Sequence, residues 1–168
     1  MPVKLRNVEK IGIQPKFEHK FPDGFIIIID TREQNALFKR PPKGLTIVRD
    51  TLSIGDYSIR GFESQISVER KNLSDLIISI SKERERFKKE LEKLQTYSHK
   101  WLFVEATEHE CLCWQEFSQM HPNSIRGTLV SIEIRYGIPF YFQPDRRQME
   151  RHLLDLFCKY YKVKRNPE

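Results

Sequence analysis

Short apolar runs, each bounded by turn residues or charges, divide much of the chain into strand-sized segments. Residues 25–29 are apolar at every position, and the turn sequence Pro22-Asp23-Gly24 precedes them. A run that is apolar on both faces is typical of a strand covered on both sides, so we expect a central strand here. Further strands are predicted at 45–49, 101–104 and 138–142.

Turn residues also predict a hairpin. Two short runs, 57–60 and 66–68, flank Gly61 at a spacing that favours antiparallel pairing. Residues 31–44, which end in Pro-Pro-Lys-Gly, are expected to form a connection or a short helix.

Apolar residues recur at helical spacing elsewhere. Leu73, Leu76, Ile77 and Ile80 stand at i, i+3, i+4 and i+7, and the stripe continues, so one helix or two helices end to end are expected over about 74–97. Other helices are predicted at 125–136 and 146–161. Strands that alternate with helices indicate an α/β fold, with a partly parallel sheet between layers of helices.

The length and composition suit one domain with its own core. The chain has 168 residues, of which 39% are hydrophobic and 31% charged, which excludes collagen-like and disordered proteins. Residues 1–24 lack a clear period, so we expect an N-terminal arm at 1–24 and a single domain at 25–168. The longest apolar run is too short to span a membrane, and no signal peptide is recognisable; we therefore expect a cytoplasmic protein.

Two further features of composition bear on function. Lys and Arg number 29 against 23 acidic residues, and the net charge of +6 is a weak indication of a polyanionic partner. An odd count of three cysteines is typical of reduced thiols. A zinc site is the sharper alternative, but it lacks a Cys-x-x-Cys pair. Its four candidate ligands are His109, Cys111, Cys113 and His121.

Acidic residues stand where the predicted strands begin or end. Asp30 follows the first strand, Asp56 follows Gly55, Glu69 closes a strand, and Asp75 opens a helix. Carboxylates at neighbouring strand ends are the ligands that Mg²⁺ prefers, and a bound ion activates water and neutralises phosphate charge. The alternative is that these acids are solvated, with Asp75 favouring the helix N-terminus.

Glu69 and Lys71 are the most informative pair. Residues i and i+2 of a strand point to the same side, so the sequence Glu-Arg-Lys places a carboxylate and an ammonium on one face and Arg70 on the other. The carboxylate is suited to a metal, and the ammonium is suited to positioning a water or stabilising a phosphate transition state.

The motif Gly55-Asp56 … Glu69-Arg70-Lys71-x-x-x-Asp75 resembles the GD…ERKxxxD signature of the XPF/Mus-type structure-specific endonucleases. Asp30-Thr31-Arg32-Glu33 is similar to the upstream D-x-R-E of that family, and Tyr57 agrees with it as well. The resemblance covers about 25–104 and extends toward the last helix. It implies a restriction-endonuclease-like PD-(D/E)XK fold, with a central mixed β-sheet flanked by helices, and DNA cleavage that depends on Mg²⁺ or Mn²⁺.

The resemblance also implies roles for single residues. Asp56 and Glu69 would bind metal with Asp30 as a third acid, and Lys71 would be the catalytic lysine. The implied catalytic set is Asp30, Glu33, Asp56, Glu69, Arg70, Lys71 and Asp75.

Basic residues are the expected DNA contacts. The segment with Arg84 and Arg86 resembles the one that follows the signature in bacterial and phage-type members, where arginine reaches a phosphate or braces the acids. The alternative is a solvated helix face. Aromatic residues, Trp114 among them, are expected in the core. The predicted DNA-binding set is Arg32, Arg84, Arg86, Lys162, Lys164 and Arg165.

Many members of that family carry a helix-hairpin-helix module, and no Gly-rich hairpin follows here before Glu168. We therefore expect a bacterial, archaeal or phage-encoded nuclease that grips DNA with its own basic surface, as a homodimer or through a partner chain. The alternatives are a non-catalytic DNA-binding scaffold subunit, a nuclease acting on RNA, and a restriction-type enzyme with base recognition.

Overall fold

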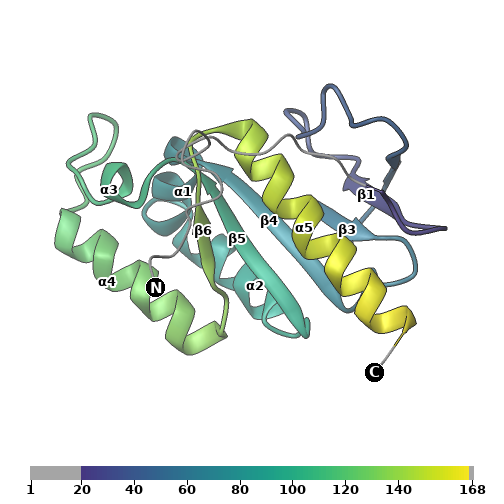
Figure 1. Ribbon diagram of the computed structural model, residues 1–168. Helices are drawn as coiled ribbons and strands as arrows, with labels where there is room; N and C mark the ends of the chain where they lie inside the picture. The colour runs from purple at the N-terminus through teal and green to yellow at the C-terminus, as the bar shows by residue number, and fades with distance from the viewer. Residues whose placement is uncertain (1–19, 167–168) are drawn as a thin grey trace, which may run out of the picture.

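A six-stranded sheet, in the order β2-β1-β3-β4-β5-β6, forms the middle layer of the computed structural model, which describes residues 20–166 (Figure 1). The strands are β1 (Ile26–Asp30), β2 (Thr46–Asp50), β3 (Tyr57–Ile59), β4 (Ile66–Asn72), β5 (His99–Glu105) and β6 (Phe140–Phe142). The helices are α1 (Leu73–Ile80), α2 (Arg84–Leu94), α3 (Glu108–Cys111), α4 (Pro122–Tyr136) and α5 (Arg146–Arg165).

The sheet is mixed. β1 runs parallel to β2 and antiparallel to β3, and β3 pairs antiparallel with β4. β4, β5 and β6 are parallel to one another. The predicted α/β class and the predicted hairpin between 57 and 68 are therefore confirmed.

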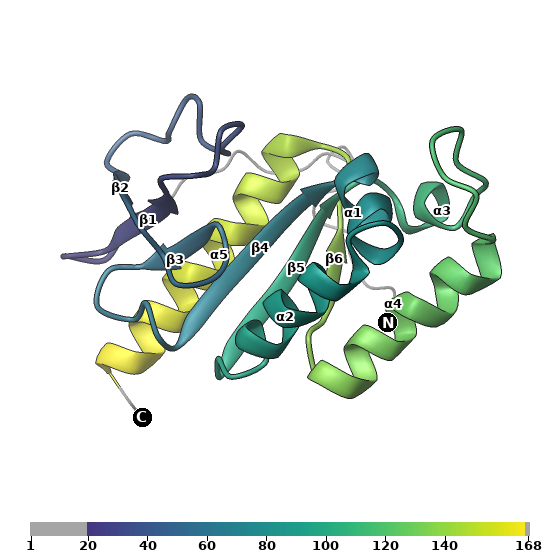
Figure 2. The ribbon, with the colours of Figure 1, turned by 180° about the vertical axis from the view of Figure 1, so that it is seen from behind.

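Helices cover both faces of the sheet, and the alternation of side chains along each strand decides which core they enter. Phe103 packs with α5, whereas its neighbours Leu102 and Val104 pack with α1, α2 and α4. α5 lies on one face in Figure 1, and α1, α2 and α4 lie on the other in Figure 2. In residues 20–166, no helix is long and apolar enough to cross a membrane.

The segment expected to be one or two helices is two. Asn72 caps α1 by accepting a hydrogen bond from the backbone of Asp75. α1 ends at Ile80, and the hydroxyl of the next residue, Ser81, donates to the carbonyl of Ile77 at 2.6 Å and competes with the helix pattern. α2 then starts at Arg84, so the two helices are separate bodies on one face of the sheet.

Residues 31–44 contain no helix, and the short α3, which a capping box of Thr107 and Glu110 supports, was not predicted. The prediction that Trp114 is a core residue was wrong, because its loop leaves 66% of it exposed. The expected arm at 1–24 falls largely on residues 1–19, outside the described residues, and it stays a prediction.

The apolar stripe of α5 holds that helix on the sheet. We expect Phe157→Ala, at a fully buried position, to lower the free energy of unfolding by about 3–5 kcal/mol because it leaves a cavity. Val163→Ala, on the exposed side of the same helix, should change it by about 0.5 kcal/mol or less. Urea denaturation measures both, and equal effects would contradict this packing.

Candidate functional site

The β3–β4 hairpin brings Asp56 and Glu69 together at one end of a cleft. The backbone of Asp56 donates to the carbonyl of Val68 at 2.9 Å, and the backbone N–H of Arg70 donates to Asp56 Oδ2 at 2.7 Å. Gly55 makes this approach possible, because it has φ +82° and a Cβ there would lie 2.0 Å from the hydroxyl oxygen of Ser67. The turn that precedes β3 therefore requires glycine.

Glu69 and Lys71 lie on the same face of β4, toward α2. Lys71 Nζ donates to Glu69 Oε1 at 3.0 Å and lies 3.9 Å from Glu90 Oε2. The same ammonium stands 4.9 Å from the centre of the Phe87 ring. The side chains of Lys71 and Glu69 are only 9% and 17% exposed, so this ion pair is nearly dry.

Burial makes the two carboxylates difficult to ionise together. Burial first, and then the negative charge of Glu69, raises the pKa of Asp56 to about 8. Burial also raises the pKa of Glu69, although Lys71 opposes the shift. The pKa of Lys71 is raised as well, because Glu69 and Glu90 outweigh the opposing effect of burial. The site therefore holds one ammonium against two carboxyl groups and favours an additional cation.

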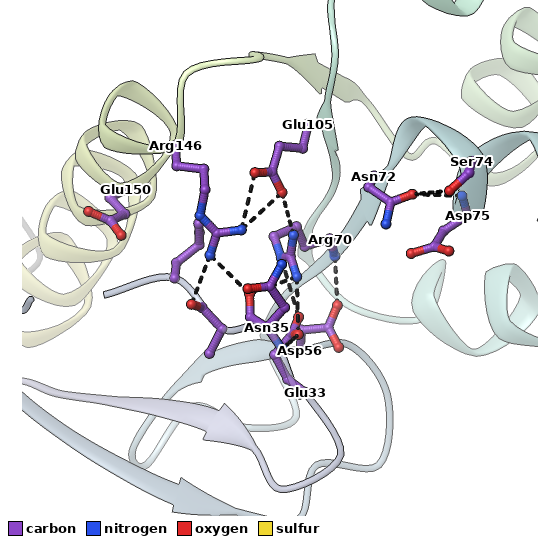
Figure 3. Close-up of polar contacts among 12 residues, drawn as sticks. Glu33, Asn35, Asp56, Arg70, Asn72, Ser74, Asp75, Glu105, Arg146 and Glu150 are labelled. Carbon is purple, nitrogen blue, oxygen red and sulfur yellow. Dashed lines mark hydrogen bonds and ion pairs between the residues drawn. The ribbon is translucent and has the colours of Figure 1, made fainter. Parts of the chain in front are cut away.

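Arg70 points to the opposite face of β4, where it joins the loop after β1 to β5 (Figure 3). Its guanidinium donates to Glu33 Oε1 at 3.1 Å, to Glu105 Oε2 at 2.5 Å and to the carbonyl of Asn35 at 2.9 Å. Arg146 at the start of α5 donates to Glu105 at 3.1 Å and to the same carbonyl of Asn35 at 2.9 Å. This network fixes the loop behind the acidic pair.

Sequence reasoning missed two members of that network. Glu105 follows the apolar run 101–104 directly, as Asp30 follows 25–29, so the same signal was present for it. Arg146 gave no signal, because nothing near it in the sequence indicates that α5 begins beside β5.

Asp30 is buried and has both carboxylate oxygens bonded. Oδ1 accepts from the backbone N–H and from Nε of Arg32, at 2.9 and 2.7 Å. Oδ2 accepts from Nη2 of Arg32 at 3.0 Å and from the backbone of Leu52 at 2.8 Å. Burial raises the pKa of Asp30, but these hydrogen bonds lower it by more, so the net shift is downward. Asp30 is a paired anion at the border of the cleft.

A cleft of about 420 Å³ opens over these acids, and four basic side chains line its walls together with Glu90. Arg86, Lys89 and Lys93 stand at i, i+3 and i+7 on α2, so one face of that helix lines the cleft, and Arg32 lines it from the opposite side. Lys89 and Lys93 were not singled out from the sequence, although this spacing was visible there. The cleft residues are Asp30, Arg32, Ser53, Ile54, Gly55, Asp56, Glu69, Arg86, Lys89, Glu90 and Lys93.

Other predicted site residues lie elsewhere. Asp75 is exposed in the first turn of α1, and within the described residues no ion pair joins it to Arg70 (Figure 3). Arg84 is exposed on α2 but does not line the cleft.

The predicted C-terminal cluster of DNA contacts is also remote from the cleft. Lys162, Lys164 and Arg165 are exposed at the end of α5, on the face of the sheet opposite α2. That last turn lies near the start of β4, because Tyr160 donates to Gln65 there.

The zinc alternative finds no support in the described residues. Cys113 lies 3.7 Å from His109, but Cys111 is buried, and burial raises its pKa to about 11. Between residues 20 and 166, no three His, Cys, Asp or Glu side chains come close enough together to hold a metal ion. A metal at the acidic cleft would therefore have fewer than three of these side chains as ligands.

Comparisons with known proteins place this geometry in a family. A model described as "ERCC4 domain" matches residues 29–156. A curated protein of Methanocaldococcus jannaschii, described as a putative ATP-dependent RNA helicase, is 33% identical over 122 residues. That alignment covers 73% of this chain and 14% of the relative, so this chain spans about one seventh of that protein's length.

Solved structures share the fold. XPF from Aeropyrum pernix is 18% identical, with a TM-score of 0.60 over 84% of this chain and 66% of that one. The same protein in complex with DNA gives a TM-score of 0.58 at 18% identity, over 86% of this chain and 68% of that one. The predicted restriction-endonuclease-like fold is confirmed by this likeness, and so is the predicted XPF-type resemblance.

The buried acidic pair predicts an unusual pH dependence of stability. The pKa of Asp56 is about 8 in the folded protein, above its ordinary value, so the folded state binds a proton that the unfolded state releases. Stability should therefore fall as the pH rises from about 4 to about 8. In the presence of a chelator, Asp56→Asn should increase the free energy of unfolding at pH 8–9 by about 1–3 kcal/mol, and by much less at pH 4.

Urea denaturation of both proteins at the two pH values measures this difference. Glu133→Gln, which removes an exposed acid from α4, is the matched control and should show no pH-dependent gain. An Asp56→Asn protein that is less stable than wild type at pH 9 would contradict the charge repulsion.

Proposed function

This chain belongs to the ERCC4 domain family, and from that premise we propose that it is a metal-dependent endonuclease that hydrolyses phosphodiester bonds in DNA. We further propose that it acts on branched DNA, such as flaps, forks or junctions. One observation carries the proposal: two partly buried carboxyl groups with raised pKa values line one cleft, and the buried Lys71 is hydrogen-bonded to one of them.

The donor set suits Mg²⁺ or Mn²⁺. Such ions commonly take one or two protein carboxylates and complete their coordination with water and phosphate oxygens, so a third protein acid is not needed. Among residues 20–166, Asp56 Oδ1 and Glu69 Oε2 accept no hydrogen bond, whereas both oxygens of Asp30 and of Glu33 do. We therefore assign Asp56 and Glu69 as metal ligands, and Asp30 and Glu33 as residues that brace the site.

The metal, Lys71 and Arg70 would each have a distinct task in the reaction. When bound, the metal would lower the pKa of a water and neutralise phosphate charge. Lys71 opposes the rise in the pKa of Glu69 through their hydrogen bond. Because its ammonium lies beside this metal-binding carboxylate, we propose that it also stabilises negative charge that develops on the phosphate. Arg70 orients Asp56 through its backbone N–H and anchors Glu33 through its side chain.

The basic walls are suited to a nucleic acid. Arg32, Arg86, Lys89 and Lys93 border the cleft, and their charges would meet the phosphates on either side of the scissile bond. Arg86 is held at the rim by Glu83 at 2.5 Å and by Glu90 at 3.5 Å. We propose that these residues provide the DNA contacts nearest to the site. The solved XPF complex, whose partner is DNA, supports DNA over RNA as the substrate.

A non-catalytic scaffold subunit is the alternative function, and the acids favour an enzyme over it. A scaffold has no need for a buried, charge-repelling carboxyl pair, because that pair costs stability. This chain has Asp56 and Glu69 in one cleft, with Lys71 bonded to Glu69, which favours an enzyme.

We predict that Glu69→Gln abolishes cleavage. Removing one metal-binding carboxylate should reduce the single-turnover rate with Mn²⁺ by at least about a hundredfold, because the loss of stabilisation at such a site is typically about 3 kcal/mol or more. DNA binding measured with a chelator present should be unchanged or slightly stronger. The cleavage assay compares branched DNA, linear DNA and RNA of the same sequence as substrates.

Glu133→Gln is the matched control and should cut as fast as wild type. Wild-type protein that cuts no substrate with either metal, or a Glu69→Gln protein that cuts at the wild-type rate, would contradict the proposal. Cleavage of RNA but not of DNA would leave the site assignment intact and overturn the substrate.

A further inference from the structure

Helix α2 separates the acidic cleft from a second groove. Arg86, Lys89 and Lys93 line the cleft, while Arg84 and Lys88 stand on another side of the same helix. There they face α4 across a groove of about 520 Å³, which we call the α2/α4 groove. Its lining includes Arg84, Lys88 and Leu91 of α2, with Thr128, Ser131 and Arg135 of α4. Figure 2 shows the two helices on the same face of the sheet.

The cations of this groove have no anionic partner in the described residues. Arg84, Lys88 and Arg135 are exposed, and no carboxylate of residues 20–166 lies within ion-pair distance of any of them. Arg86, two residues from Arg84, is instead paired with Glu83 and Glu90. Three unpaired cations around one groove, against the single acid Glu85, favour a polyanion.

A partly apolar pocket continues the groove beyond Arg84. It has a volume of about 700 Å³, and Ile80, Phe117 and Met120 line it together with polar residues that include Lys82 and Glu116. Arg84 and Ile80 line both hollows, so the two are adjacent. Phe117 comes from the loop between α3 and α4 and is 43% exposed. An exposed aromatic ring beside unpaired cations is the combination that binds single-stranded nucleic acid, with phosphates on the cations and a base on the ring.

We propose that the α2/α4 groove binds a single-stranded arm of the same DNA whose duplex lies in the acidic cleft. Arg84, Lys88 and Arg135 contact the phosphates of the arm, and an unpaired base packs on Phe117. α2 then lies between the two parts of the substrate, with a basic side toward each. This inference rests on the proposed function, because it requires that the duplex part of the same DNA binds in the acidic cleft.

The test is equilibrium binding of fluorescent DNA with a chelator present, so that no cleavage is needed. Two probes are compared: a duplex with one single-stranded arm, and the same duplex without it. The variant Arg84→Ala/Lys88→Ala/Arg135→Ala should bind the armed probe about tenfold more weakly. The slope of log affinity against log salt should fall by about 2, since each contact to a single strand contributes about 0.7. Binding of the plain duplex should be unchanged.

A second variant separates stacking from charge. Phe117→Ala should weaken binding of the armed probe about fivefold or more and leave the salt slope as in wild type. The matched control, Lys39→Ala/Arg40→Ala/Lys43→Ala, removes three exposed charges from the loop before β2, at the other edge of the sheet, and should match wild type. Circular dichroism verifies the fold of each variant.

The outcomes distinguish this inference from the proposed function. Equal losses in both triple variants, or no loss in the groove variant, would overturn the groove while Glu69-dependent cleavage stands. A selective loss of arm binding in the groove variant, together with a wild-type protein that never cuts DNA, would support the groove and contradict the nuclease.

Discussion

The burial of two like charges, Asp56 and Glu69, is the constraint on which the site depends. The turn at Gly55 brings the two strands of the hairpin close enough that these carboxyl groups share one partly buried corner of the cleft. Lys71 compensates only part of their charge, so the pair remains a site that favours a further cation. The stability lost through this repulsion is expected at sites that bind metals, where function and stability oppose one another.

The rest of the fold keeps that corner rigid and accessible. Arg70, on the other face of β4, ties Glu33 to Glu105, and Arg146 connects the same network to the start of α5. On the face of the sheet that carries Glu69 and Lys71, α2 buries Phe87 and Leu91 in the core and presents its basic residues to the cleft. The strand β4 therefore has the proposed metal ligands on one face and the residues that brace them on the other. Helix α2 packs its apolar side on the core and presents its basic side to a charged ligand.

Much of this architecture was predictable because it depends on local patterns. The apolar run 25–29 identified a buried strand, and the i, i+2 spacing of Glu69 and Lys71 placed them on one face. Long-range relations were not predictable from such patterns. Nothing near Arg146 indicates its contact with Glu105, 41 residues away in the sequence, and the cluster at Lys162–Arg165 gave no sign that it lies across the sheet from Glu69. A basic run in the sequence indicates positive charge, but the face of the sheet on which that charge lies depends on the fold.

The central claim is that the buried pair is a cation site, and calorimetric titration with Mn²⁺ tests it most directly. Repeating the titration at pH 7 in buffers with different ionisation enthalpies counts the protons released on binding. Because the pKa of Asp56 is about 8 and a ligand must be deprotonated, we predict binding with release of about one proton. Glu69→Gln should lose both the binding and the proton release. Mn²⁺ binding of equal strength in that variant, or none in the wild type, would contradict the account.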